Sequence, residues 1–226
     1  MEILGQEGGN TTASLIAKEE HGISCFWRGD FDTARALFER CHGLNEPTHR
    51  AVSNAWSVQD QYNQTLIYLA AATAFLGHVA EGRARLGEAL THAKELKHPF
   101  TSAFALSVAA IFESIVGSHR AAERYAAELA AISTEHGFPF YVAWANLFQG
   151  RSLAALGQPN EGFKLITNSL PMMRATGAVL GNCGIARRFC GAELRLHCMT
   201  ADQRDALRTE TAQRERRREL LKDWRT

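Results

Sequence analysis

The sequence predicts an all-α fold in which helical hairpins repeat along the chain and stack as an α-solenoid. Two features recur every forty residues, and a fixed period of this length is the signature of a repeat architecture. One is a turn glycine, at Gly77, Gly117 and Gly157, and the other is a proline followed by phenylalanine, at Pro99 and Pro139. Between these stops, apolar residues recur at intervals of three and four, the period of an α-helix.

The composition carries no strong electrostatic preference. The 226 residues are 46% hydrophobic with a formal net charge of +1, enough for one large domain or a short helical array. This balance gives no reason to expect nucleic acid or a membrane surface as partner. No apolar run reaches the ~18 residues of a membrane span, and the polar, glycine-rich residues 1–10 lack the features of a secretory signal. We therefore expect a cytoplasmic protein whose residues 1–10 are disordered.

Residues 11–57 predict a first helical repeat that ends in a long loop. Its turn glycine is Gly29, 48 residues before Gly77, and the polar segment from Asn45 to Ser57 accounts for the longer spacing. Residues 58–179 then predict three repeats of forty residues, each made of two helices. In each repeat the glycine stops the first helix with left-handed backbone. Proline cannot continue a helix but starts one well, so it marks the next repeat.

Small residues at fixed offsets from the turn glycine predict where the two helices of a hairpin cross closely. Seven positions before it stand Ala70, Ala110 and Gly150, and five positions after it stand Gly82, Ala122 and Gly162. A bulky residue at Gly82 or Gly162 should overpack the crossing and cost roughly 1–3 kcal/mol. Nine positions after the glycine, apolar residues predict buried contacts with the next repeat, at Leu86, Ala126 and Ile166. The first unit holds the corresponding residues Gly22, Ala34 and Phe38.

Residues 180–226 depart from this pattern. The register predicts a turn glycine near position 197, where the sequence has His197, and Arg187 and Arg188 interrupt an apolar face. We interpret the segment as a divergent helical cap, since the terminal repeats of a solenoid need a polar outer face, or as a shifted reading frame after Leu180. Its end alternates charges of both signs, which is typical of a solvated helix that frays.

A resemblance to a known family rests on the stretches FWRGDFDTARALFER, YLAAATAFLGHVAEGRARLGEAL, HPFTSAFAL, GFPFYVAWANLFQGRSLAALGQPNEGFKLI and MRATGA. They look like the C-terminal tetratricopeptide-like tail of large bacterial signalling proteins, in which an adenylate or guanylate cyclase domain precedes an AAA-type ATPase module. The resemblance covers residues 22–181. It implies a tetratricopeptide-like array of about four repeats, whereas cyclase or ATPase activity would belong to upstream domains.

No motif in the sequence predicts catalysis, a cofactor or a metal. The phosphate-binding loop G-x-x-x-x-G-K-[ST] is absent, as are H-E-x-x-H and G-x-S-x-G. Cys183, Cys190 and Cys198 lie close to His197. Their spacings of seven and eight residues do not suit a structural zinc site, whose ligand pairs stand about two to four residues apart. We therefore expect a chain that is not an enzyme.

The candidate binding site is a groove lined by the first helix of each repeat, which forms the inner surface of stacked helix pairs. The register places six residues there: Gln64, Phe104, Ser107, Trp144, Leu147 and Arg151. Aromatic and guanidinium side chains such as Trp144 and Arg151 are enriched at binding hot spots. The alternative is that the aromatic residues belong to the core between repeats.

Together these features predict a non-catalytic interaction or regulatory scaffold derived from a bacterial signalling cyclase or ATPase. The expected partner is a protein or peptide, including the upstream ATPase or cyclase modules, or a second copy of the chain in a homo-oligomer. Two other functions fit the same pattern. One is a sensor domain that binds a small ligand in the groove. The other is a self-associating fragment without independent function, since an array without caps exposes an apolar end.

Overall fold

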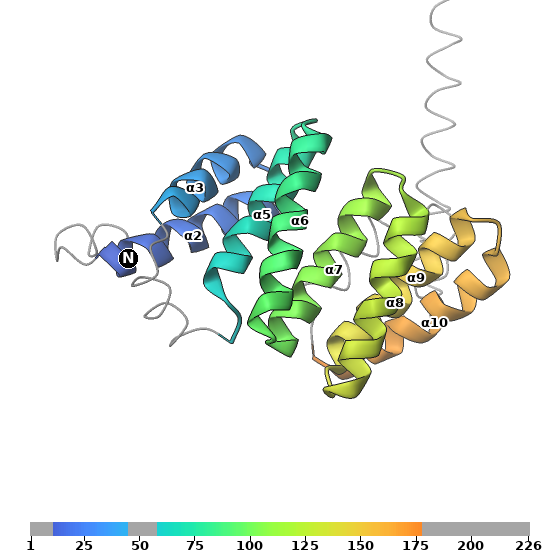
Figure 1. The fold of residues 1–226 in the computed structure, drawn as a ribbon. Coiled ribbons are helices and arrows are strands. Elements are labelled where there is room, and N and C mark those ends of the chain that lie inside the picture. Colours follow the sequence, from blue (N-terminus) through green and yellow to red (C-terminus); the bar gives the residue numbers. More distant parts are fainter. Residues whose placement is uncertain (1–10, 45–57, 178–226) are drawn as a thin grey trace, which may run out of the picture. The chain divides into compact units, whose positions relative to one another are not determined.

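The computed structural model describes residues 11–44 and 58–177. Within these ranges the chain forms eight α-helices and no strand, which confirms the predicted all-α fold. Figure 1 labels the helices, whose bounds are α2 Thr11–Arg28, α3 Phe31–Gly43, α5 Gln61–Phe75, α6 Val79–Leu96, α7 Pro99–Ile115, α8 His119–Glu135, α9 Pro139–Ala155 and α10 Pro159–Ala175. The predicted disordered start (1–10), the loop at 45–57 and the cap or tail at 180–226 lie outside the described residues.

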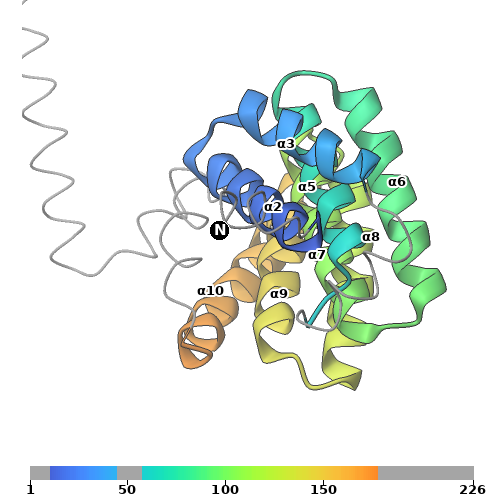
Figure 2. The ribbon, with the colours of Figure 1, turned by 90° about the vertical axis from the view of Figure 1, so that its left-hand side faces the viewer.

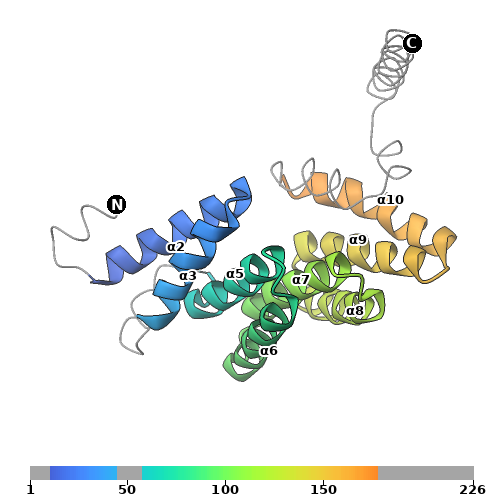
Figure 3. The same ribbon diagram turned by 90° about the horizontal axis from the view of Figure 1, so that it is seen from above.

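The helices pair into hairpins, α2 with α3, α5 with α6, α7 with α8 and α9 with α10 (Figure 1). Helices α2, α5, α7 and α9, the first of each hairpin, also contact one another in turn and form one layer. Figure 3 shows α6 and α8 on one side of α5, α7 and α9. Figure 2, seen from the first hairpin, shows α5 behind α2 and α3, which both contact it. The predicted hairpin array is therefore confirmed over the described residues.

The array up to Met172 forms one compact unit. Of the remaining chain, Met173–Thr226, the structure describes residues 173–177, which hold the last turn of α10 and the residues that follow it. The surfaces considered below all belong to the first unit.

The predicted turn glycines adopt the left-handed backbone that ends the first helix of each hairpin. Their φ angles are 87° at Gly29, 96° at Gly77, 80° at Gly117 and 92° at Gly157. After Gly77, the His78 N–H donates to the Thr73 carbonyl at 3.1 Å, the long closing bond of a Schellman helix end. The other three turns close in the same way.

A second left-handed position follows the other helix of the second, third and fourth hairpins, and the sequence pattern did not reveal it. Gly137 and Gly177 have φ angles of 70° and 73°, and the residue at the same repeat position in the second hairpin is Lys97, with φ 52°. Among the described residues Lys97 is the non-glycine residue with positive φ. Its side chain makes this turn more strained than its two counterparts.

Helix starts follow the local chemistry of the chain. Pro99 and Pro139 are the first residues of α7 and α9, as predicted, because a proline at this position loses no helical hydrogen bond. Asp60 caps α5 with its carboxylate, which accepts from the Asn63 N–H at 2.7 Å. The same carboxylate lies 3.2 Å from the Nε2 atom of His92 at the end of α6, so the cap also ties the two helices together.

The predicted close crossings are confirmed. A Cβ atom built on Gly82 would lie 2.7 Å from the Ala70 carbonyl oxygen and 3.0 Å from the Cβ of Ala74. In the fourth hairpin, a Cβ on Gly150 would lie 2.6 Å from the Gly162 carbonyl oxygen. The large apolar residues nine positions after the turns, Phe38, Leu86 and Ile166, are buried as expected, and so is the smaller Ala126 at the same position of the third hairpin.

One further repeat position links each hairpin to a neighbouring one. The sixth residue after the turn glycine is Arg35, Arg83 or Glu123 in the first three hairpins. Each reaches the following hairpin through a polar contact: Arg35 Nη2 to Glu81 Oε1 at 3.3 Å, Arg83 Nε to Glu113 Oε1 at 2.8 Å, and Gln149 Nε2 to Glu123 Oε1 at 3.3 Å. We call these contacts the bridges. In the fourth hairpin the position is Phe163, an apolar residue.

Candidate binding site

The six residues of the predicted groove all lie in the layer of first helices, but most are buried. The exposed fraction is 8% for Gln64, 4% for Ser107, 6% for Trp144 and 2% for Leu147. Only Phe104 and Arg151 are partly exposed. The groove hypothesis therefore stays a prediction, and it depends on these two side chains rather than on all six.

Trp144 has the contacts of a core residue. Its ring centroid lies 5.7 Å from that of Phe140 and 5.4 Å from that of Phe148, along one face of α9. Its indole nitrogen is buried and finds no hydrogen-bond acceptor among the described residues, an uncommon arrangement for a buried N–H. An alanine substitution at Trp144 would therefore test core packing together with binding, and Arg151 and Phe104 are the cleaner positions to probe.

A stripe of partly exposed apolar side chains runs along α7. We call it the α7 stripe, and it consists of Phe100, Phe104, Val108, Ile111 and Ile115. Spacings of four, four, three and four residues put these side chains on one face of the helix. The exposed fraction reaches 37% at Ile115. No charged residue interrupts the stripe.

Aromatic side chains of the neighbouring first helices flank the α7 stripe. The ring centroid of Phe104 lies 6.1 Å from that of Tyr68 on α5, and that of Phe100 lies 5.5 Å from that of Tyr141 on α9. Burial raises the pKa of both tyrosines, and at Tyr68 a hydrogen bond with the Trp27 side chain lowers it in part. Both phenols are therefore neutral at physiological pH, which keeps the flanks of the stripe uncharged.

The apolar surface continues at the turns that end the first helices. Trp27, Phe75 and Ile115 each stand two residues before a turn glycine, and their exposed fractions are 58%, 39% and 37%. Phe75 stacks on Phe31 with ring centroids 4.8 Å apart, which fixes its orientation. Exposed aromatic residues that are held by their neighbours are common in interaction surfaces.

The sequence pattern pointed to only one residue of the α7 stripe, Phe104. The helix is apolar around nearly its whole circumference, which normally indicates burial on all sides. Its other faces do enter the core, through Ala105, Ala109 and Phe112. A signal for the stripe was therefore present in the sequence, but which face remains open depends on how the neighbouring hairpins pack.

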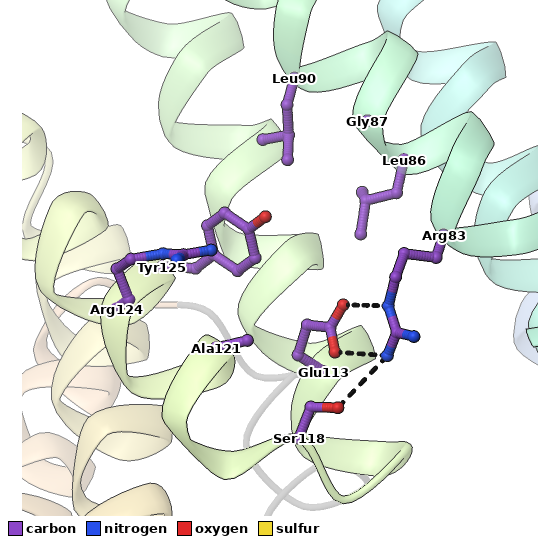
Figure 4. A pocket seen from close by; sticks show the side chains of 9 residues that line it. All are labelled: Arg83, Leu86, Gly87, Leu90, Glu113, Ser118, Ala121, Arg124 and Tyr125. Atoms are coloured by element: carbon purple, nitrogen blue, oxygen red, sulfur yellow. Dashed lines mark hydrogen bonds and ion pairs between the residues drawn. The ribbon is translucent and has the colours of Figure 1, made fainter. Parts of the chain in front are cut away.

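A hollow, which we call the outer cleft, lies between α6 and α8 with the end of α7 at its base (Figure 4). Arg83 of α6 donates through Nε and Nη2 to the two carboxylate oxygens of Glu113, each at 2.8 Å. The Nη2 group also lies 3.2 Å from the Ser118 hydroxyl. The Glu113 side chain is 5% exposed and that of Arg83 is 49% exposed, so the pair joins a buried carboxylate to a half-exposed guanidinium.

A buried carboxyl group, that of Glu19, lies between helices α2 and α5. Glu19 of α2 is 3% exposed, and its Oε1 atom accepts a hydrogen bond from the Thr65 hydroxyl of α5 at 2.9 Å. Burial raises the pKa of Glu19 from 4.5 to about 8, with smaller effects from the Thr65 hydrogen bond, which lowers it, and from the charges of Glu20 and Asp60, which raise it. The group is therefore mostly protonated at neutral pH.

The described residues contain no group of three His, Cys, Asp or Glu side chains placed to hold a metal. Cys25 and Cys41 are buried, whereas Cys183, Cys190, Cys198 and His197 lie outside the described residues. None of the helices in the described part of the chain is long and apolar enough to cross a membrane.

Comparison with known proteins gives no assignment. The chain matches no protein-family model, and no curated protein is significantly similar to it in sequence. The function must therefore be argued from the surfaces described above.

Proposed function

We propose that the chain is a non-catalytic interaction scaffold of the cytoplasm that binds a protein or peptide on its layer of first helices. The observation that carries this proposal is the α7 stripe, an uncharged apolar surface as long as the helix itself. A stripe of partly exposed apolar side chains favours association, because covering it removes the remaining apolar area from water. The exposed Phe75 and Trp27 extend the apolar surface toward the first hairpin's turn.

The shape of the α7 stripe favours an amphipathic helix as the bound segment. From Phe100 to Ile115 the stripe is about 22 Å long at 1.5 Å per residue, which matches about four turns of a partner helix. Such a helix would present apolar residues at i, i+3, i+4 and i+7. The absence of charge along the stripe argues against recognition of an acidic or basic motif there. Large apolar anchors would supply most of the affinity.

The resemblance to cyclase and ATPase tails gives the first partners to test. We propose that the bound segment belongs to an ATPase or cyclase module, encoded in the same parent gene or in a neighbouring reading frame. Co-expression of such a module with this chain, followed by co-purification, tests that source. A second copy of the chain is the alternative occupant, and light scattering of the purified chain distinguishes it by mass.

Site-specific photo-crosslinking in the source cells tests the surface itself. A photoreactive phenylalanine at Ile115 is expected to give a discrete adduct, and the same probe at Ala131, exposed on α8, is the matched control. The adduct should be lost when Ile111→Gln is added, because an amide on the stripe must be desolvated in the complex. An adduct from Ala131 only, or one from Ile115 that survives Ile111→Gln in a folded chain, would overturn the proposal.

A further inference from the structure

The outer cleft has the size of a small-molecule site. Its volume is about 390 Å³, within the roughly 300–1,000 Å³ of typical ligand pockets. The cleft lies on the opposite side of the array from the α7 stripe, because Glu113 lies about half a helical turn away from the stripe residues around α7. It is therefore distinct from the surface proposed above.

The walls of the outer cleft are largely apolar. Leu86 and Leu90 enter it from α6, and Ala121 and the ring of Tyr125 enter it from α8 (Figure 4). Leu90 and Tyr125 pack against the core cluster that contains Leu86, so these walls are fixed in place. Gly87 leaves further room, since a Cβ atom built there would meet no atom within 4 Å. A flat or branched apolar group could occupy this space.

Two guanidinium groups line the same cleft. Arg83 is oriented by its two-pronged contact with Glu113, which uses Nε and Nη2. Its Nε and Nη2 groups are taken by Glu113 and Ser118, and Figure 4 draws its Nη1 nitrogen on the side away from Tyr125, so Arg83 contributes positive charge to the cleft. The guanidinium carbon of Arg124 lies 5.1 Å from the Tyr125 ring centroid, and this cation–π contact does not use the N–H groups as hydrogen-bond donors. The lining residues include no further charged group besides Glu113.

The charge balance of the outer cleft selects the ligand class. Two arginines and one carboxylate leave one positive charge in excess, which a monoanion neutralises. A polyphosphate would bring several negative charges close to the buried carboxylate of Glu113 and would find few donors on the apolar walls. A carboxylate is the anion whose planar geometry guanidinium groups match best.

We propose that the outer cleft binds a small organic monocarboxylate whose apolar body lies on Leu86, Leu90 and Tyr125. Its carboxylate accepts hydrogen bonds from Arg124, and the charge of Arg83 adds to the attraction. The ligand contacts α6 of the second hairpin and α8 of the third, so its binding adds to the apolar packing and the Arg83–Glu113 bridge that already join these two hairpins.

Titration of the full chain with phenylacetate, followed by two-dimensional amide NMR, tests this proposal. Phenylacetate should shift the signals of Gly87, Ala121 and Tyr125 in a saturable way, with a Kd of about millimolar for so small a probe. Phenylacetamide, which has the same shape without the charge, should bind at least tenfold more weakly. Adding phosphate at equal concentration should displace little of the bound phenylacetate, because it has no apolar body.

Three variants decide whether the shifts come from the outer cleft. Arg124→Gln removes one guanidinium and should weaken binding at least tenfold, whereas Arg120→Gln, on the same helix and exposed, should leave it unchanged. Gly87→Leu fills the cleft where the backbone has room and should abolish binding. The proposal is overturned if phenylacetamide binds as well as phenylacetate, if Arg124→Gln and Arg120→Gln behave alike, or if no saturable shift occurs at these residues.

Discussion

Replacing Glu19 by glutamine should remove a large part of the pH dependence of folding. Glu19 is buried between α2 and α5, where its carboxyl group accepts from Thr65, and its pKa is raised from 4.5 to about 8. A carboxyl group whose pKa is higher in the folded chain than in the unfolded chain makes its full contribution to the free energy of unfolding at pH values below its pKa in the unfolded chain. That contribution is lost as the pH rises toward the folded pKa. Stability should therefore fall between pH 4.5 and about 8 and level off above it.

The magnitude follows from these two pKa values. Each pH unit between them corresponds to 1.36 kcal/mol, so the free energy of unfolding should fall by roughly 2–3 kcal/mol between about pH 5 and pH 7. Glutamine has nearly the same shape, stays neutral and can keep a hydrogen bond to Thr65. The variant Glu19→Gln should therefore lack this fall and be more stable than the wild type at pH 7 by about 3 kcal/mol.

Urea unfolding followed by circular dichroism at several pH values measures this difference. The quantity to plot is the free energy of unfolding of Glu19→Gln minus that of the wild type, because pH effects of other groups then cancel. Glu20→Gln, at an exposed neighbouring position, is the matched control and should leave most of the wild-type slope in place, because the charge of Glu20 makes only a smaller contribution to the pKa of Glu19. If the wild type and Glu19→Gln show the same slope between pH 5 and pH 7, the carboxyl group is not desolvated and the reasoning is refuted.

Three further predictions concern stability and use the same unfolding assay. Gly82→Ala should destabilise the chain by about 1–3 kcal/mol, because the new methyl group meets backbone atoms. Gly87→Ala on the same helix should stabilise it by about 0.5–1 kcal/mol. Equal effects at both positions would contradict the close crossing. Lys97→Gly should stabilise the chain by about 1 kcal/mol by relieving its positive φ, and a loss of stability would argue against that backbone conformation. Arg83→Ala should lower the free energy of unfolding by about 2 kcal/mol, because it leaves the Glu113 carboxylate buried and unpaired. Adding Glu113→Gln should recover most of this loss. A double variant that is no more stable than Arg83→Ala would show that the charge of Glu113 is not the cause.

The fold could be predicted from the sequence because its determinants are local and repeat. Turn glycines, prolines at helix starts and small residues at crossings each act within one hairpin, and the period puts them in register. The turn after the second helix was missed because Lys97 occupies the position that Gly137 and Gly177 mark in the following hairpins. A lysine there gives no signal of left-handed backbone.

The candidate surfaces were less predictable because exposure depends on packing between hairpins. Phe104 and Trp144 occupy the same repeat position, yet Phe104 is partly exposed and Trp144 is 6% exposed. The register alone cannot separate them. The outer cleft also needs residues from two hairpins, since Arg83 and Glu113 stand 30 residues apart in the sequence. Nothing in either local sequence indicates that they meet.

The bridges imply that the hairpins of this array are not interchangeable modules. Duplicating the third hairpin in tandem would place Glu123 of the first copy where Arg83 normally stands, beside the buried Glu113 of the second copy. Two carboxylates would then face each other without a cation between them, which disfavours that order. Charge at a single repeated position thus encodes the sequence in which hairpins can follow one another, and anyone who lengthens or shuffles this array would have to recode that position at every junction.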